Sequence, residues 1–183
     1  MSARPKRITR SPSTELRVAR LVGRMKQGEW HMDLINGVPR SGHDTVGGIV
    51  LLGRVIDKMR AHIAGTLGEY VSHRGFSADV FELFGTDAET FEEIVRTHDT
   101  DEGVLASLMA IKHLTAEEIA AFNLENVTWP ANDPAALERM HGRMASAGHG
   151  DRLDIVCALD QLDLDEGREV PIGGRHAAGL THH

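Results

Sequence analysis

The stretch IVLLGRVIDKMRAHIAGTL, residues 49–67, is the strongest helical pattern in the chain and decides the fold. Placed on a wheel of 100° per residue, its apolar residues gather on one face. That face is formed by Leu52, Val55, Ile56, Met59 and Ile63. The pattern predicts a central helix packed into the core, with Gly68 as its stop.

The opposite face of this helix is unusual because it combines small or apolar residues with a single acidic residue. It carries Val50, Gly53, Asp57, Ala61 and Ala64. Small residues allow a second helix to approach closely, so Asp57 is expected inside a helix contact. A buried carboxylate is costly unless it is paired. Arg54 and Arg60, three residues before and after Asp57, are therefore the expected partners, with one of them donating a bidentate bond.

In the rest of the chain, capping and stop residues divide the sequence into short helical patterns. Strand-like alternation is absent. Helical patterns with capping or stop residues cover 11–28, 76–84, 87–98, 100–113, 115–124, 133–147 and 151–162. The predicted fold class is all-α, a compact bundle of roughly seven or eight short helices around the central one.

The predicted organisation is a single helical domain between two flexible tails. The tails are residues 1–10 and 170–183, and the domain is residues 11–169. Within the domain, residues 11–40 form an extension and residues 41–169 the core.

Composition restricts the class of protein. The chain has 183 residues, of which 41 % are hydrophobic and 26 % charged, as in ordinary globular domains. Its single cysteine, Cys157, excludes an intramolecular disulfide and a cysteine-based zinc site, and suits a reducing compartment. No apolar run approaches the roughly 18 residues of a membrane helix. We therefore expect a cytoplasmic protein with no membrane partner.

The net charge of −7 hides a strong asymmetry along the chain. Residues 1–76 hold 13 Lys or Arg against 6 Asp or Glu, whereas residues 77–169 hold 6 against 21. The simplest interpretation is that the two parts pack on each other or on a second copy, so a homo-oligomer is a candidate assembly. Nucleic acid is not an expected partner, since no aromatic-interleaved basic patch or recognition motif is present.

Cations outnumber the acid on the central helix. Arg54, Lys58 and Arg60 surround Asp57, and His62 adds a titratable ring. Two things could balance this surplus: a small anionic ligand such as a carboxylate or phosphate, or the acidic second half of the same chain. The first implies a binding site beside the helix, and the second an internal salt-bridge network.

Several motifs resemble a bacterial family that is catalogued only as a domain of unknown function. The resemblance rests on Gly47-Gly48, on R-x-I-D-K-x-R-A from Arg54 to Ala61, and on Tyr70. Further matching positions are Phe84-Gly85-Thr86-Asp87, Arg152-Leu153-Asp154-Ile155 and the acidic turn at 163–168. The family resemblance covers roughly residues 40–169.

The resemblance implies an all-α fold and a functional role for the charged helix, but no activity. It also adds Asn123 and Arg152 as candidate binding residues. The chain departs from the family pattern in two places. Residues 1–40 extend beyond the usual start, and Phe122 stands before Asn123 where the family has Trp.

These residues predict acid–base chemistry on a small anionic metabolite, of isomerase, lyase or cyclase type and without a cofactor. Arg54, Lys58 and Arg60 would hold the anion, and Asp57 or His62 would move a proton. Tyr70 would donate a hydrogen bond. The alternative is a non-catalytic oligomerisation or interaction module in which the same charges are structural.

No metal site is expected, although the chain has 11 histidines. The histidines before the tail lack the HxH, HxxxH and HExxH spacings of metal ligands. The alternative is a site assembled in three dimensions from His62, Glu69 and His73. Cys157, in the apolar run IVCAL, is expected to be core rather than a nucleophile.

Overall fold

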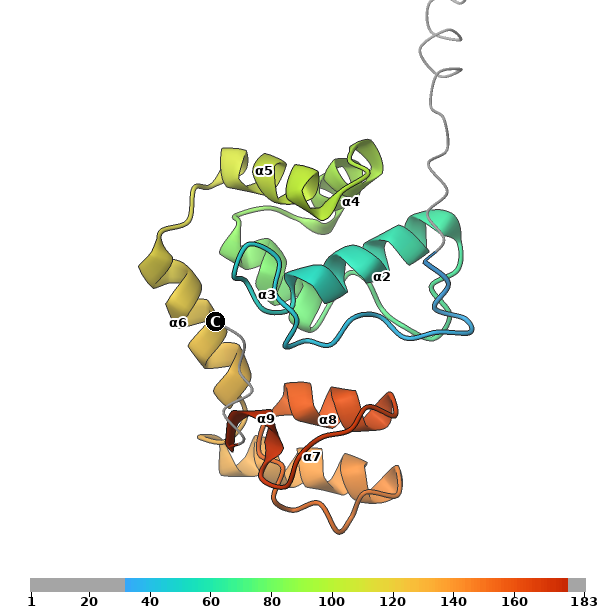
Figure 1. Cartoon of the computed structure of the whole chain (residues 1–183), viewed down its shortest axis with the longest axis vertical. Helices are drawn as coiled ribbons and strands as arrows, with labels where there is room; N and C mark the ends of the chain where they lie inside the picture. The colour runs from blue at the N-terminus through green and yellow to red at the C-terminus, as the bar shows by residue number, and fades with distance from the viewer. Residues whose placement is uncertain (1–31, 178–183) are drawn as a thin grey trace, which may run out of the picture. The chain divides into compact units, whose positions relative to one another are not determined.

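The central helix of the protein is α2, Leu52–Ala64, and the other helices are arranged around it (Figure 1). The structure is a computed structural model that describes residues 32–177. Over these residues the chain forms helices joined by turns, with isolated bridges but no strand. The predicted all-α fold class is confirmed. The predicted helix at 11–28 lies outside the described residues.

The ends of α2 differ from the predicted 49–67. Residues 46–51 form a turn instead of a first helical turn, with Val46 and Ile49 exchanging backbone hydrogen bonds of 3.1 and 3.2 Å. Leu51, fully buried, completes this turn at a φ of 67°. At the other end Gly65 adopts a left-handed conformation (φ 73°), and its N–H donates to carbonyls of the last helical turn. Gly65, rather than Gly68, therefore ends the helix.

Four helices follow α2 in the sequence. They are α3 (Phe76–Leu83), α4 (Ala88–Thr97), α5 (Asp101–Ile111) and α6 (Ala116–Thr128). α3 and α4 pack on α2, and α5 packs on α4. The predicted capping box of α6 is confirmed, since the Thr115 side chain and the Glu118 side chain each accept a hydrogen bond from the other residue's backbone N–H.

The last helices are α7 (Pro134–Ser146), α8 (Ala158–Asp165) and α9 (Gly174–Ala177). α8 packs on both α6 and α7. The predicted helix at 151–162 is wrong in its first half, because residues 151–156 are turns and Cys157 is the N-cap residue of α8. Cys157 also forms an isolated bridge with Pro130, which fixes it in an extended conformation before the helix begins.

Two groups of buried apolar side chains form the core. The larger group contains the predicted stripe of α2, in which Leu52, Val55, Ile56 and Met59 are at most 1 % exposed. The smaller one lies around α7 and α8, and its buried members are Met140, Met144, Ile155, Ala158 and Val170.

The second face of α2 is buried at Gly53, Asp57 and Ala61, as predicted, but Ala64 is exposed, and a loop covers part of this face. Arg54 and Lys58, beside it, are also buried. At Gly53, a Cβ atom would lie 3.1 Å from the guanidinium carbon of Arg40. The expectation that another helix approaches Gly53 closely is therefore wrong: the absence of a side chain admits the Arg40 guanidinium instead.

The tail region after α8 is partly described. Val170 is 8 % exposed, and Gly173 donates its N–H to Asp154 at 2.7 Å. Arg152 fixes this segment further by donating to the carbonyls of Val170 and Pro171. Within residues 32–177, no helix is both long and apolar enough to cross a membrane.

Candidate functional site

The buried acid of α2 is paired with an arginine from the preceding loop. Asp57, 1 % exposed, accepts three hydrogen bonds of 2.7 to 2.9 Å from the backbone N–H, Nε and Nη2 of Arg40. Neither Arg54 nor Arg60 is its partner, so that prediction is wrong. Arg54 and Arg60 lie on α2 with Asp57, and their guanidinium groups point to other elements. Arg40 lies in a loop, so it can donate both its backbone N–H and its side chain to the Asp57 carboxylate.

Arg54 is paired with an acid from the end of α8. Its two terminal nitrogens donate to the two carboxylate oxygens of Glu166, one of them at 2.8 Å. Arg168 also donates to Glu166, so this carboxylate lies between two guanidinium groups. Burial raises the pKa of Glu166, but the hydrogen bonds and charges of Arg54 and Arg168 outweigh it and hold the pKa below its usual value.

Arg60 is paired with an acid from the start of α5. Its Nη1 lies 2.7 Å from Asp101, and the same carboxylate accepts a hydrogen bond from Arg40 at 2.5 Å. Burial lowers the pKa of Arg40, but its hydrogen bonds to Asp57 and Asp101 outweigh it and raise the pKa above its usual range. Arg40 therefore joins α2 to α5 through two carboxylates.

Lys58 is the exception among the charged residues of α2. It is 7 % exposed, and its Nζ donates to the Val71 carbonyl at 3.0 Å and the Ser77 hydroxyl at 2.9 Å. Both acceptors are uncharged, and Lys58 has no carboxylate at ion-pair distance within residues 32–177. Burial, followed by the charge of Arg54, lowers the pKa of Lys58 to about 8. An amine of this kind loses its proton close to physiological pH.

Tyr70 lies beside the same group of charges. The guanidinium carbon of Arg54 is 5.8 Å from the centre of its ring. Burial, followed by the charge of Glu166, raises the pKa of Tyr70 to about 12. The phenol therefore stays protonated and remains a hydrogen-bond donor. Arg54, Lys58 and Tyr70 are the predicted site residues that the structure brings together.

Three other predicted site residues lie elsewhere. His62 is 37 % exposed at the end of α2, 3.7 Å from Glu92, and its ring packs edge-on against His73. The Asn123 side chain accepts from Val50 N–H and donates to the Gly48 carbonyl, which fixes the turn before α2. Arg152 forms a bidentate pair with Asp154. Asn123 and Arg152 therefore both have hydrogen-bond partners within the chain.

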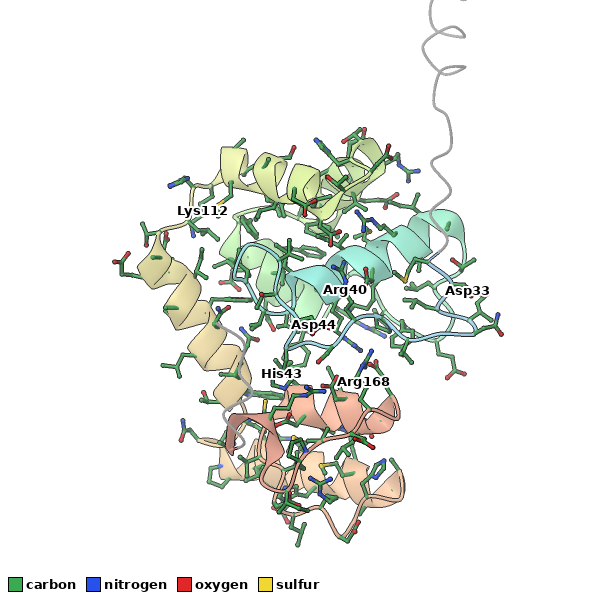
Figure 2. The ribbon with its side chains drawn as sticks, in the orientation of Figure 1. Asp33, Arg40, His43, Asp44, Lys112 and Arg168 are labelled. Atoms are coloured by element: carbon green, nitrogen blue, oxygen red, sulfur yellow. The ribbon has the colours of Figure 1, made fainter. Side chains whose placement is uncertain are left out.

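The loop before α2, which the sequence did not single out, carries more buried polar groups than expected. Figure 2 shows Arg40, His43 and Arg168 between α2 and α8. Ser41, 4 % exposed, donates to Asp163 at 2.7 Å, and Asp163 is also paired with Arg168 and Arg175. The available signal was the dense run R-S-G-H-D at residues 40–44, where every residue but the glycine bears a polar side chain.

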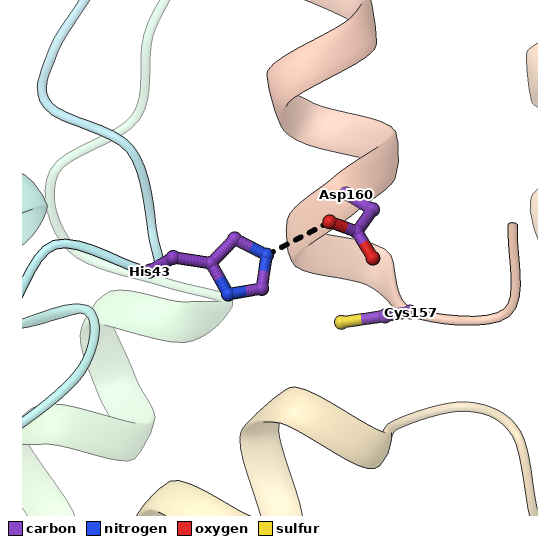
Figure 3. A group of neighbouring side chains, drawn as sticks. All are labelled: His43, Cys157 and Asp160. Atoms are coloured by element: carbon purple, nitrogen blue, oxygen red, sulfur yellow. Dashed lines mark hydrogen bonds and ion pairs between the residues drawn. The ribbon is translucent and has the colours of Figure 1, made fainter. Parts of the chain in front are cut away.

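His43 from this loop lies in the interior near Asp160 of α8 and near Cys157, the N-cap residue of that helix (Figure 3). Its Nε2 lies 3.0 Å from Oδ1 of Asp160, and Cys157 lies one helical turn before Asp160. His43, Cys157 and Asp160 are all at most 2 % exposed. Burial raises the pKa of Cys157 to about 11, so the free thiol is protonated. In the described part of the chain these residues bring three potential ligand atoms within 4.8 Å of one another, whereas His62, Glu69 and His73 do not form such a group.

A cavity in the structure does not involve the charged residues of α2. It has a volume of about 810 Å³ and lies between α3 and α6, with Phe76, Phe122 and Trp129 among its apolar walls. Asp79, on the same wall, has its pKa raised by burial and by Glu125. None of the residues predicted for the anion site lines this cavity.

Comparison with known proteins gives a family and no activity. Residues 36–168, well over half of the chain, match the family model described as "Domain of unknown function (DUF5069)". No curated protein matches the chain. The matched region begins before Arg40 and ends at Arg168, so it includes both of the arginines that connect the loop to α2 and α8. The chain belongs to the DUF5069 family of domains of unknown function.

Proposed function

We propose that the protein binds a small anionic metabolite beside α2, at Lys58 and Arg54, and transforms it by acid–base chemistry in the cytoplasm. The observation that carries the proposal is the buried amine of Lys58, which has neutral hydrogen-bond partners and a pKa lowered to about 8. A catalytic acid or base works best when its pKa lies near the working pH. Perturbed groups of this kind are concentrated at functional sites.

The surrounding charges support the choice of Lys58 over its neighbours. Asp57 is held by Arg40, Arg54 by Glu166, and Arg60 by Asp101. The surplus positive charge that the sequence predicted around Asp57 is therefore reduced to Lys58. A carboxylate or phosphate that replaced its contacts with Val71 and Ser77 would supply the missing negative charge.

The residues at this site suggest distinct roles. Lys58 would exchange the proton, and the neutral phenol of Tyr70 would donate a hydrogen bond to the ligand. Arg54, already paired with Glu166, would contribute its positive charge from beside the ligand. Asp57 is reassigned from proton carrier to structural partner of Arg40, since three hydrogen bonds occupy its carboxylate.

Access to the amine requires a change in the segment that covers it. Lys58 is reached from the side of residues 65–75, where the Val71 carbonyl accepts its hydrogen bond. The Val71 side chain is exposed and Tyr70 is half-buried, so the hydrogen bond to the Val71 carbonyl ties Lys58 to a segment that is in part exposed to solvent. Ligand binding would displace the Val71 carbonyl and transfer the ammonium hydrogen bond to the anion.

A second candidate function is a non-catalytic interaction module. It is favoured because Asp57, Arg54 and Arg60 each form an ion pair with another residue of the chain. In that case the charges of α2 serve packing alone, and the acidic second half of the chain supplies their balance.

Thermal unfolding with anions separates the two functions. Phosphate, sulfate, succinate and citrate are tested at constant ionic strength on the wild-type chain, Lys58→Met and Lys112→Met. The control residue Lys112 is 43 % exposed, next to Glu118. A ligand that binds only the folded state raises its melting temperature.

The anion site predicts a shift in the wild type and in Lys112→Met that disappears in Lys58→Met. No shift with any anion, or an equal shift in Lys58→Met, supports the non-catalytic module instead.

A further inference from the structure

We propose that His43, Cys157 and Asp160 form a binding site for a zinc-like divalent metal ion, which joins the loop before α2 to the start of α8. The three side chains come from segments more than 110 residues apart in sequence and converge in the protein interior (Figure 3). This proposal is independent of the anion site at Lys58.

The geometry of the three ligand atoms supports a shared ion. One ring nitrogen of His43, the Cys157 sulfur and an Asp160 oxygen lie within 4.8 Å of one another. Zinc binds histidine nitrogen and carboxylate oxygen at about 2.0–2.2 Å and cysteine sulfur at about 2.3 Å. Two atoms bound at such distances lie roughly 3–4 Å apart. The 3.0 Å between His43 Nε2 and Asp160 Oδ1 is at the short end of this range. The 4.8 Å range of the whole group is wider, so the three ligand atoms would draw together on binding an ion.

The side chains themselves leave polar atoms unsatisfied. Nδ1 of His43 is buried and has no hydrogen-bond partner. The Cys157 sulfur lies 3.9 Å from the Asn126 carbonyl, a weak contact for its only donor. Burying polar atoms without partners is costly, so a tightly packed apolar core would not select these residue types. A metal ion bound by Nε2 would engage the Cys157 sulfur, whereas Nδ1 on the other side of the ring would still lack a partner.

The chemistry of the ligands selects the class of metal. Thiolate and imidazole favour zinc and related transition metals, whereas calcium and magnesium prefer oxygen ligands. A thiolate and a carboxylate together neutralise a divalent ion, which suits a site this deeply buried. Three protein ligands leave a fourth position for water or another oxygen.

The surroundings of Asp160 hold its carboxylate in place. Its Oδ1 also accepts a hydrogen bond from the backbone N–H of Arg175 at 3.3 Å. A Cβ atom on Gly174 would lie 2.5 Å from Asp160 Oδ2, so α9 approaches the carboxylate closely because residue 174 is glycine. Contacts of this kind orient a metal ligand.

Burial argues for a metal over a reactive thiol. A cysteine nucleophile must reach a substrate, but Cys157 is 2 % exposed, and its sulfur contacts the Asn126 carbonyl instead of the His43 ring. A site closed to substrate suits a structural ion, which would stabilise the fold by linking the loop to α8.

Cobalt absorption spectroscopy tests the site directly, because Cys157 is the one cysteine of the chain. The full-length chain, treated with chelator and reductant, is titrated with Co²⁺. Binding is expected to produce a thiolate-to-cobalt charge-transfer band at one ion per chain, which Zn²⁺ then displaces. The terminal histidines are replaced in the background (His182→Gln, His183→Gln), so that they do not bind the metal.

Variants test whether the three residues act together. Cys157→Ser should abolish the band, and Asp160→Asn and His43→Gln should each weaken cobalt affinity by at least about tenfold. His62→Gln, at the rejected histidine pair, is the matched control and should leave the titration unchanged.

The absence of a thiolate band in the folded wild type overturns the proposal. So does an unchanged affinity in a folded Asp160→Asn variant, because the metal would then bind without one of the proposed ligands. Circular dichroism of each variant establishes that it is folded, and the wild-type band alone decides the question if a variant is not.

Discussion

Arg40 and Asp57 form the most extensive polar contact of α2, in which one arginine donates its backbone N–H and two guanidinium N–H groups to one buried carboxylate. The residues are 17 positions apart, so the contact fixes the loop against the helix. Arg40 then extends to Asp101 on α5. The Arg40 side chain thus connects the loop before α2 to both α2 and α5.

Removing Arg40 should destabilise the fold strongly. Arg40→Met removes the guanidinium and two of the three hydrogen bonds to the buried Asp57 carboxylate, and keeps only the one from the backbone N–H. Breaking a buried ion pair in this way costs about 3–5 kcal/mol. Urea unfolding measures the loss, with the exposed Arg74→Met as the control. A loss below about 1 kcal/mol, the range of surface ion pairs, would contradict the assignment.

Lys58 should make stability depend on pH in the alkaline range. Its pKa is about 8 in the folded protein, against the ordinary lysine value of 10.5 in the unfolded chain. Between these values the unfolded state binds more protons, so the folded state gains stability as pH rises. Relative to Lys58→Met, the wild type should gain about 3 kcal/mol between pH 7 and pH 11.

Urea unfolding of both proteins across that pH range provides the measurement for Lys58. The comparison cancels titrations that the two proteins share, including that of Tyr70. A difference that stays constant with pH would show that the buried amine keeps an ordinary pKa.

Glu166 should contribute stability that acid removes. Its pKa is lowered in the folded state, so its contribution is present above its unfolded value of 4.5 and is lost as pH falls through the folded pKa. Glu166→Gln should cost about 3–5 kcal/mol at pH 7, because Arg54 stays buried without a carboxylate. The variant should then lose less stability than the wild type below pH 4.5.

The exposed Glu169→Gln is the matched control for Glu166. Acid titration of both variants and the wild type, followed by circular dichroism, measures the effect. Equal acid sensitivity of Glu166→Gln and the wild type would exclude the proposed role of this carboxylate.

Asn123 should affect stability without affecting anion binding. Its side chain satisfies the Val50 N–H and the Gly48 carbonyl, and Asn123→Ala removes both bonds. The expected cost is about 1–3 kcal/mol. Asn132→Ala, at an exposed position, should be nearly neutral. If Asn123→Ala instead abolished an anion-induced thermal shift, the residue would belong to the binding site after all.

The sequence predicted helices well where local signals define them. The apolar stripe of α2 and the capping box at Thr115 were predicted from spacing alone, and both are present. The start of α2 was misplaced because the turn at residues 46–51 depends on Asn123, which is distant in sequence. The first half of the predicted helix at 151–162 was wrong for the same reason, since the bridge to Pro130 is a tertiary contact.

The pairing of charges was the least predictable feature. Local spacing placed Arg54 and Arg60 near Asp57, but their actual partners come from α8 and α5. Electrostatic partners in a folded chain depend on which elements pack together, and periodicity does not encode that. The acidic second half of the chain was nevertheless correctly offered as one source of neutralising charge.

The loop at residues 39–44 has a consequence for the order of events during synthesis. Ser41 bonds to Asp163, 122 residues later, and Arg168 donates to the carbonyl of Pro39. The ribosome must therefore release nearly the whole domain before these partners exist, and α2 emerges with one of its sides uncovered. A nascent chain stalled before α8 should remain vulnerable to proteases and chaperone capture at this loop until its last turns appear.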